Sequence, residues 1–118
     1  MSELRVLGAL LRLVVTAISV VVAAKLLPGQ LEVGDFGSAL IFAFVLGVLN
    51  ALLKPILFLL TLPLNMLTLG LFTLVVNAIV FWLATMFPLG VTVTGFTGAF
   101  LAALVVSVVS FILSRLIP

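Results

Sequence analysis

Long stretches without a charge dominate the pattern of hydrophobic and polar positions along the chain. Five basic and three acidic residues leave sixty uncharged residues over 55–114 and eighteen over 36–53. A bilayer core of roughly 30 Å takes about 20 helical residues, so the longer stretch holds two crossings and the shorter one a third. Pro88 and Gly90 mark the break between the two crossings of the longer stretch.

A further crossing precedes these, although only residues 13–24 are free of charge there. Arg12 and Lys25 can bracket it if their aliphatic stems lie along apolar surface and their charges reach the headgroups. Lys25 directly after Ala23-Ala24 also argues against a cleaved signal peptide. The pattern therefore predicts an all-α transmembrane bundle with four helices, at about 4–27, 36–53, 65–87 and 96–115.

The connection between the second and third helices is unusually apolar. The 32 residues between Lys54 and Phe87 carry no charge and would extend about 48 Å as one helix, more than a bilayer core requires. Pro55 and Pro63 each remove a backbone donor and obstruct a preceding helical turn. We therefore expect 54–64 to be an interfacial connection with a short helix at 56–62, and the third helix to begin near residue 65.

The positions of the basic residues predict the orientation. With four crossings, both chain ends and the 54–64 connection share one side of the membrane, which carries Arg5, Arg12, Lys54 and Arg115. Only Lys25 lies on the other side. The positive-inside rule then places both termini in the cytoplasm.

The chain aligns with itself at an offset of sixty residues. The matched pairs are Pro28 and Pro88, Val33 and Val93, Phe36 and Phe96, Ala39 and Ala99, Ala43 and Ala103, Val45 and Val105, Val48 and Val108, and Leu53 and Leu113. This predicts a duplicated two-helix unit, with repeat one at about 4–53 and repeat two at about 65–115 in a single membrane domain. Both repeats enter the membrane in the same direction, so a pseudo-two-fold axis along the membrane normal relates them.

Two details follow from that axis. Segments 30–34 and 90–94 alternate apolar and polar residues, which predicts a short antiparallel two-stranded sheet that caps the outer face. Small residues recur every fourth position on the second and fourth helices and predict that these two helices cross closely, although small residues are also common in membrane spans. The predicted packing residues are Ala39, Ala43, Gly47, Ala99, Ala103 and Ser107.

The amino-acid composition limits the kinds of chemistry that the protein can carry out. With 66% hydrophobic and 7% charged residues, the chain has too little polar surface to cover a soluble domain. It has no His, Cys or Tyr, so imidazole or thiolate metal sites, Cys or His nucleophiles and disulfides are excluded. We expect no enzyme activity, no cofactor and no metal. A nucleic-acid role has no basic patch to support it.

Three polar side chains lie at depth in the predicted spans. Asn50 and Asn77 are amides, and Lys54 lies one turn below Asn50 on the same helix face. They either form a polar seam for an ion, a solute or a lipid headgroup, or they fix helix register by hydrogen bonding. The offset pairs Asn50 with Ser110 and Asn77 with Ala17, and this mismatch favours the structural role. Lys54 is better explained as a topology anchor than as a ligand.

We interpret the remaining basic residues as lipid anchors. Arg5 and Arg12 are seven residues apart on one helix face, and Lys25 and Arg115 lie at span ends. A basic cytoplasmic rim that binds anionic lipid headgroups explains the first pair. The alternative is that Arg12 meets a buried acceptor, for which no acidic partner exists in any span.

Several motifs carry a resemblance to a known family. The stretch LGVLNALLKPIL at 46–57, with LTLP at 60–63, LTLGLF at 67–72 and then Asn77, resembles the phage holin family, superfamily IV. The loop from Pro28 to Phe36 and its echo after Pro88 fit as well, except that the glycine after Pro88 is displaced to Gly90. The likeness covers nearly the whole chain. It implies a small four-span protein of the bacterial cytoplasmic membrane.

Three functions are compatible with these features. The first is a holin-like, membrane-permeabilising protein, which needs a homo-oligomer because four tightly packed helices leave no lumen. The second is a structural or accessory subunit that docks a larger membrane complex through its apolar surface. The third is a carrier with moving halves, which would need midplane polar residues that this chain scarcely has. The resemblance ranks the holin-like function first.

Overall fold

The computed structural model describes residues 2–68 and 70–117, and the side chains of residues 64 and 65 are left outside the description. The chain forms four helices and two short strands, whose bounds are Ser2–Leu26 (α1), Leu31–Val33 (β1), Phe36–Leu67 (α2), Phe72–Thr85 (α3), Val91–Val93 (β2) and Gly95–Leu116 (α4). The predicted limits of the first and last helices are confirmed to within two residues. In the described part of the chain, α1, residues 36–63 of α2, and α4 are long and apolar enough to span a membrane, and α3 is a shorter apolar helix.

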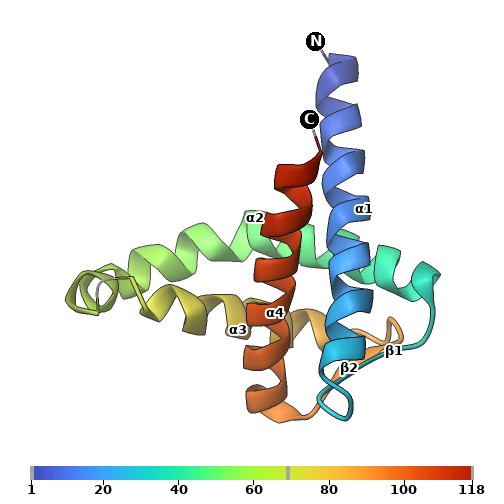
Figure 1. Cartoon of the computed structure of the whole chain (residues 1–118). Helices are drawn as coiled ribbons and strands as arrows, with labels where there is room; N and C mark the ends of the chain where they lie inside the picture. Colours follow the sequence, from blue (N-terminus) through green and yellow to red (C-terminus); the bar gives the residue numbers. More distant parts are fainter. Residues whose placement is uncertain (1, 69, 118) are drawn as a thin grey trace.

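The helices are arranged as two antiparallel pairs. α1 and α4 stand side by side with both chain ends at the top, and the α2–α3 hairpin lies across them (Figure 1). Each helix of one pair also packs against a helix of the other, since α1 contacts α2 and α3 contacts α4. The two strands lie at the ends of α1 and α4 that are remote from the termini (Figure 1).

The two strands form the predicted antiparallel sheet. Leu31 faces Val93, and Val33 faces Val91. Beyond the strands, the Gly34 amide donates to the Gly90 carbonyl at 2.9 Å, and the Thr94 amide donates to the Gln30 carbonyl at 3.1 Å. Each of these contacts maps onto its counterpart when sixty is added to or subtracted from the residue numbers. The two loops are thus joined by reciprocal backbone hydrogen bonds.

The core combines two large rings with several small residues. The rings of Phe42 and Phe81 meet edge to face, with centroids 5.0 Å apart. In a second cluster, Ala17 of α1 is fully buried against Ala39 and Ala43 of α2. Small side chains here let the two helix backbones approach closely, which drives helix packing in lipid.

The chain between α2 and α3 differs from the prediction. α2 runs without a break from Phe36 to Leu67 with Pro55 and Pro63 inside it. The expected helix ends at 53 and 65 are therefore wrong, and α3 begins only at Phe72. In apolar surroundings, leaving the helix would strand many backbone groups, whereas a proline inside the helix frees only one carbonyl, so the helix continues. The interfacial position of 54–64 stays a prediction.

The expected crossing of the second and fourth helices is also wrong. Within the described residues, no Cα atom of α2 lies within 8 Å of one in α4. Ala39 and Ala43 pack against α1, and the buried Ala99 and Ala103 lie on α4, whose neighbours are α1 and α3. The spacing of the small residues identified the faces that approach closely, but it did not identify their partners.

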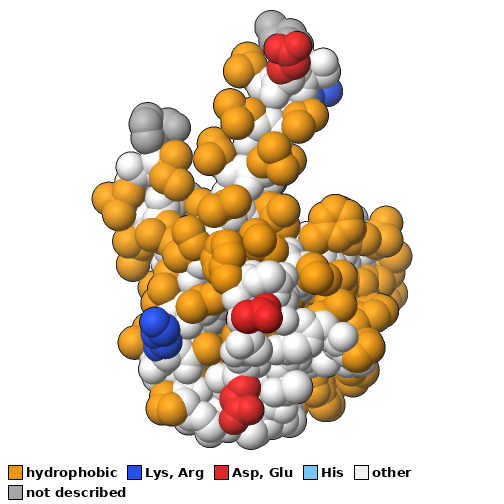
Figure 2. Space-filling view, turned by 90° about the vertical axis from the view of Figure 1, so that its right-hand side faces the viewer, with side chains coloured by type: hydrophobic (Ala, Val, Ile, Leu, Met, Phe, Trp, Pro, Cys, Tyr) orange, Lys and Arg blue, Asp and Glu red, His pale blue; other side chains and the backbone are white. Residues whose placement is uncertain are grey.

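Hydrophobic side chains cover most of the visible face of the molecule (Figure 2), and the charged side chains form isolated spots on it. The most exposed apolar residues include Leu59 and Leu60 of α2, at 74% and 73%. Such surface suits lipid contact.

Asp35 caps the start of α2, as expected of an acidic residue at that position. Its Oδ1 accepts a hydrogen bond from the Ser38 amide at 2.7 Å. At the start of α4, Thr94 precedes the helix, and its hydroxyl donates to Gln30 Oε1 at 2.7 Å and does not cap the helix. The two helix starts are therefore built differently.

We predict that Gly98→Ala destabilises the fold whereas Gly47→Ala does not. A Cβ at position 98 would lie 2.7 Å from Thr94 Oγ1 and 2.9 Å from the Gln30 carbonyl oxygen, which belongs to the backbone of the sheet loop. A Cβ at position 47 meets nothing within 4 Å. We expect a loss of about 1–3 kcal/mol for Gly98→Ala and a gain of up to about 1 kcal/mol for Gly47→Ala. Thermal unfolding of the two variants in detergent micelles tests this, and equal melting temperatures would contradict it.

We predict that Asp35 contributes to acid destabilisation. The hydrogen bonds from the Ser38 backbone and side chain lower the pKa of Asp35. The stabilisation is therefore present above the unfolded-state pKa of about 4 and is lost as the pH falls through the lower folded-state pKa. Asn is nearly as good a cap and does not titrate. Between pH 7 and pH 3 the melting temperature should thus fall more in the wild type than in Asp35→Asn, and parallel falls would contradict the assignment.

Candidate functional site

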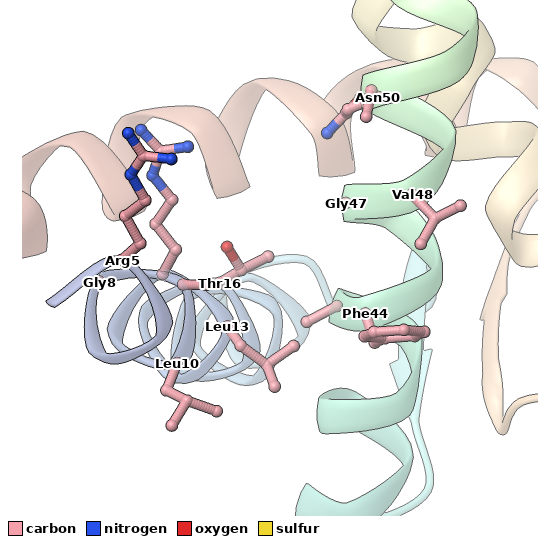
Figure 3. A pocket seen from close by; sticks show the side chains of 13 residues that line it. Arg5, Gly8, Leu10, Leu13, Thr16, Phe44, Gly47, Val48 and Asn50 are labelled. Carbon is pink, nitrogen blue, oxygen red and sulfur yellow. The ribbon is translucent and has the colours of Figure 1, made fainter. Parts of the chain in front are cut away.

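A cleft of about 940 Å³ lies between the N-terminal half of α1 and the middle of α2. Four polar side chains line it: Arg5, Arg12 and Thr16 from α1, and Asn50 from α2. Figure 3 shows Arg5, Thr16 and Asn50 toward one side of the gap, with Leu10, Leu13 and Phe44 toward the other. The cleft therefore has a polar side and an apolar side.

Helical spacing explains why these residues share one surface. Arg5, Arg12 and Thr16 are separated by seven and four residues, so they lie along one face of α1. On α2, the small residues Ala43, Gly47 and Ala51 line the cleft at spacing four. α1 and α2 are in close contact near Ala17 and Ala43. From that contact, the cleft extends toward the N-terminus of α1 and toward the C-terminal part of α2. It is open because the small residues leave space there.

The charged groups that line the cleft are both basic. Arg5 and Arg12 are exposed, and no ion pair involves either of them within the described part of the chain. No carboxylate lines the cleft. Two guanidinium groups thus face a partly apolar hollow with amide and hydroxyl groups nearby. Guanidinium groups in this setting suit oxyanions, above all phosphate.

The structure separates the two amides. Asn77 of α3 borders a much smaller cavity of about 10 Å³ between α3 and α4, together with Ala103 and Ser107. The Asn77 Oδ1 atom is buried and has no hydrogen-bond partner within the described residues. Asn50 and Asn77 therefore border two different hollows, one between α1 and α2 and the other between α3 and α4, and do not share one polar seam.

The other basic residues lie away from the cleft. Lys54 is partly buried, follows Asn50 by one turn and does not line the cleft. The Arg115 guanidinium lies 4.9 Å from the centroid of the Phe111 ring near the end of α4. Lys25 is exposed in the last turn of α1. Lys25 and Arg115 lie in the last turns of their helices, whereas Lys54 lies inside α2 and not at its end. The anchor roles stay predictions.

Sequence reasoning missed the cleft as a unit. It treated Arg5 and Arg12 as a rim, treated Asn50 as a separate helix contact and did not consider Thr16. The available signal was the run of positions 5, 9, 12 and 16, which form one face of α1 with three polar members. The partner face on α2 could be found only from the packing of the helices.

Comparison with known proteins identifies the family. A family model described as mycobacterial 4 TMS phage holin, superfamily IV, matches residues 7–112. The chain belongs to this family. The resemblance seen in the sequence motifs is thereby confirmed, and so is the placement among membrane proteins.

Two relatives of this holin-family chain have also been found. One is an uncharacterized protein of Streptomyces coelicolor, SCO3922, which is 46% identical over 83 residues, or 67% of this chain and 66% of that protein. This chain thus spans slightly less than two thirds of that relative's length. The other is the uncharacterized membrane protein YvlD of Bacillus subtilis, 34% identical over 106 residues, or 84% of this chain and 89% of that protein. No solved structure matches the chain.

We predict that Asn77→Ala is neutral or stabilises the protein by about 1 kcal/mol, because it removes a buried oxygen that lacks a hydrogen bond. At position 17, sixty residues earlier, the chain has a fully buried alanine, which places no polar side chain between the helices. The reverse change, Ala17→Asn, should cost several kcal/mol because it buries an amide between closely packed helices. Thermal unfolding in micelles measures both. A loss above about 1 kcal/mol in Asn77→Ala would instead indicate that the amide has a functional partner.

Proposed function

We propose that this holin-family protein works as a homo-oligomer in the bacterial cytoplasmic membrane and permeabilises the membrane between protomers. The observation that carries the proposal is the low burial of its spans. In the most apolar 18-residue windows of the three long helices, only 28%, 22% and 28% of residues are buried within the chain. Most of each helix is therefore free to contact lipid or another copy.

A passage within one protomer has little support. The core between the helices is filled by apolar side chains such as Val20, Phe42, Val80 and Phe81. The carrier hypothesis is weak for the same reason, since Asn50 and Asn77 border two separate hollows. Any polar path would have to form where protomers meet, and the basic cleft, which Arg5, Arg12, Thr16 and Asn50 line, is a candidate place for it.

We propose that the termini are cytoplasmic and that the two-stranded sheet caps the outer face. Four of the five basic residues, Arg5, Arg12, Lys54 and Arg115, fall on the cytoplasmic side of that topology. The two chain ends lie at the same end of the α1–α4 pair, and the sheet lies at the other (Figure 1). Both observations support one orientation.

We also propose that the two halves arose by duplication of a two-helix unit. The sheet register and the two reciprocal hydrogen bonds are symmetric under the sixty-residue offset. Burial agrees as well, since Ala39, Phe42, Ala43 and Leu46 are buried and so are Ala99, Ala102, Ala103 and Val106. These matches support a pseudo-two-fold axis that passes through the sheet.

The second candidate function is a structural or accessory subunit of a larger membrane complex. It is favoured by the end of α2 beyond Lys54, where Ile56, Leu59 and Leu60 are strongly exposed. An apolar helix end of this kind suits docking to another transmembrane helix. This candidate requires no leakage through the membrane.

Dye release from liposomes separates the two candidates. We predict that purified protein reconstituted at increasing protein-to-lipid ratios releases an encapsulated dye more steeply than in proportion to its amount, because several copies must assemble. Cross-linking in the same vesicles should show dimers or larger species. Protein-free liposomes and liposomes that carry an unrelated four-span protein are the controls. Absence of release at every ratio, with the protein shown to be inserted and folded, would reject permeabilisation and favour the accessory subunit.

A further inference from the structure

We propose that the basic cleft between α1 and α2 binds the phosphate group of an anionic phospholipid from the leaflet that holds the N-terminus. The site consists of the Arg5 and Arg12 guanidinium groups, the Asn50 amide, the Thr16 hydroxyl and the apolar wall of α1 and α2. The proposal does not depend on permeabilisation, because a protein with either proposed function would carry the same site.

Charge balance is the first argument. Two guanidinium groups line the cleft, and the described residues supply neither an ion pair for them nor a carboxylate in its lining. Unpaired cations near the hydrocarbon region are costly and are ordinarily compensated by an anion or by water. The described residues do not supply this anion, and we infer that a bound ligand does. Phosphate is the anion present at that depth in a bilayer, and guanidinium groups bind it with paired hydrogen bonds.

The shape of the cleft favours a lipid over a free anion. Arg5, Thr16 and Asn50 lie toward one side of the gap, and Leu10, Leu13 and Phe44 lie toward the other (Figure 3). A small inorganic ion would use only the polar side. A phospholipid would place its headgroup on the polar side and its acyl chains along the leucine and phenylalanine side chains. The volume of about 940 Å³ is within the range of small-molecule pockets and has room for a glycerophosphate headgroup with the first part of its chains.

The second half of the chain is an internal comparison. The offset maps Arg5 to Asn65, Arg12 to Phe72, Thr16 to Val76 and Asn50 to Ser110, so neither arginine has a basic counterpart. Between α3 and α4 lies a cavity of about 10 Å³, whose lining includes Ala103 and Ser107, the counterparts of Ala43 and Gly47. α3 begins only at Phe72, so the counterparts of cleft residues 5–11 are not part of that helix. The arginine-bearing wall of the cleft is therefore a feature of the first half.

Native mass spectrometry of the purified full chain, with titrated lipids, tests the proposal. We expect the wild type to retain phosphatidylglycerol or cardiolipin at least about tenfold more tightly than phosphatidylcholine. The double variant Arg5→Gln/Arg12→Gln should lose at least about tenfold in affinity for the anionic lipids, because basic groups near a membrane surface contribute substantially to such binding. The matched control is Lys25→Gln/Arg115→Gln, which removes the same two charges away from the cleft and should change affinity by no more than about twofold.

Several outcomes would overturn the proposal. Equal losses in the two double variants would show that binding follows net charge rather than the cleft. Equal retention of phosphatidylcholine, whose phosphate charge is balanced by its choline group, would show that the net negative charge of the headgroup is not recognised. Displacement of the lipid by millimolar inorganic phosphate would assign the site to a free anion. If the arginine variant does not fold, Gly47→Leu provides the alternative, since a Cβ there meets open space and the larger side chain fills the cleft without a change of charge. Unchanged lipid affinity in folded Gly47→Leu would reject the site.

Discussion

The constraint on which the rest of the structure depends is that every backbone N–H and C=O group in the apolar spans needs a hydrogen-bond partner within the chain, because hydrocarbon offers no water. Each unpaired group in hydrocarbon costs several kcal/mol, so only continuous helices and closed hydrogen-bonded contacts are stable there. α2 therefore continues through Pro55 and Pro63. The two loops that carry the strands bond to each other through the sheet. Even the hydroxyl of the fully buried Ser19 bonds to a carbonyl of its own helix, that of Val15, at 2.7 Å.

The same constraint explains how far the sequence predicted the fold. Uncharged stretches predicted α1 and α4, because such stretches are typical of helices buried in lipid. Alternating apolar and polar loop residues predicted the sheet, because that period is typical of paired strands. Pro55 and Pro63 wrongly predicted a break in the helix, because a broken helix can bond to solvent in water but not in hydrocarbon. The partners of the small residues were also beyond reach, since spacing along one helix describes a face and not the helix that covers it.

The candidate site shows a different limit. Its charged residues were recognised at once, because eight charges in 118 residues are easily followed. What could not be seen was that Arg5 and Asn50, 45 residues apart, border one hollow. That depends on how α1 and α2 diverge beyond the Ala17 contact, which is a property of packing. Periodicity along α1 offered a hint of the face, but nothing in the sequence indicated how deep the hollow would be.

Under the proposed duplication, the two halves share their order of helix, strand and helix but not their basic residues, and this difference bears on mechanism. A pore on the pseudo-two-fold axis would require polar residues from both halves, yet Phe42 and Phe81 meet in the core and the cleft lies to one side. The second half carries Asn77 instead, against α4, with its amide oxygen buried. Selection on a single-chain channel would be expected to keep matched polar residues. Selection on one exposed surface, used toward lipid or toward another copy, requires a polar set in only one half, which is what this chain has.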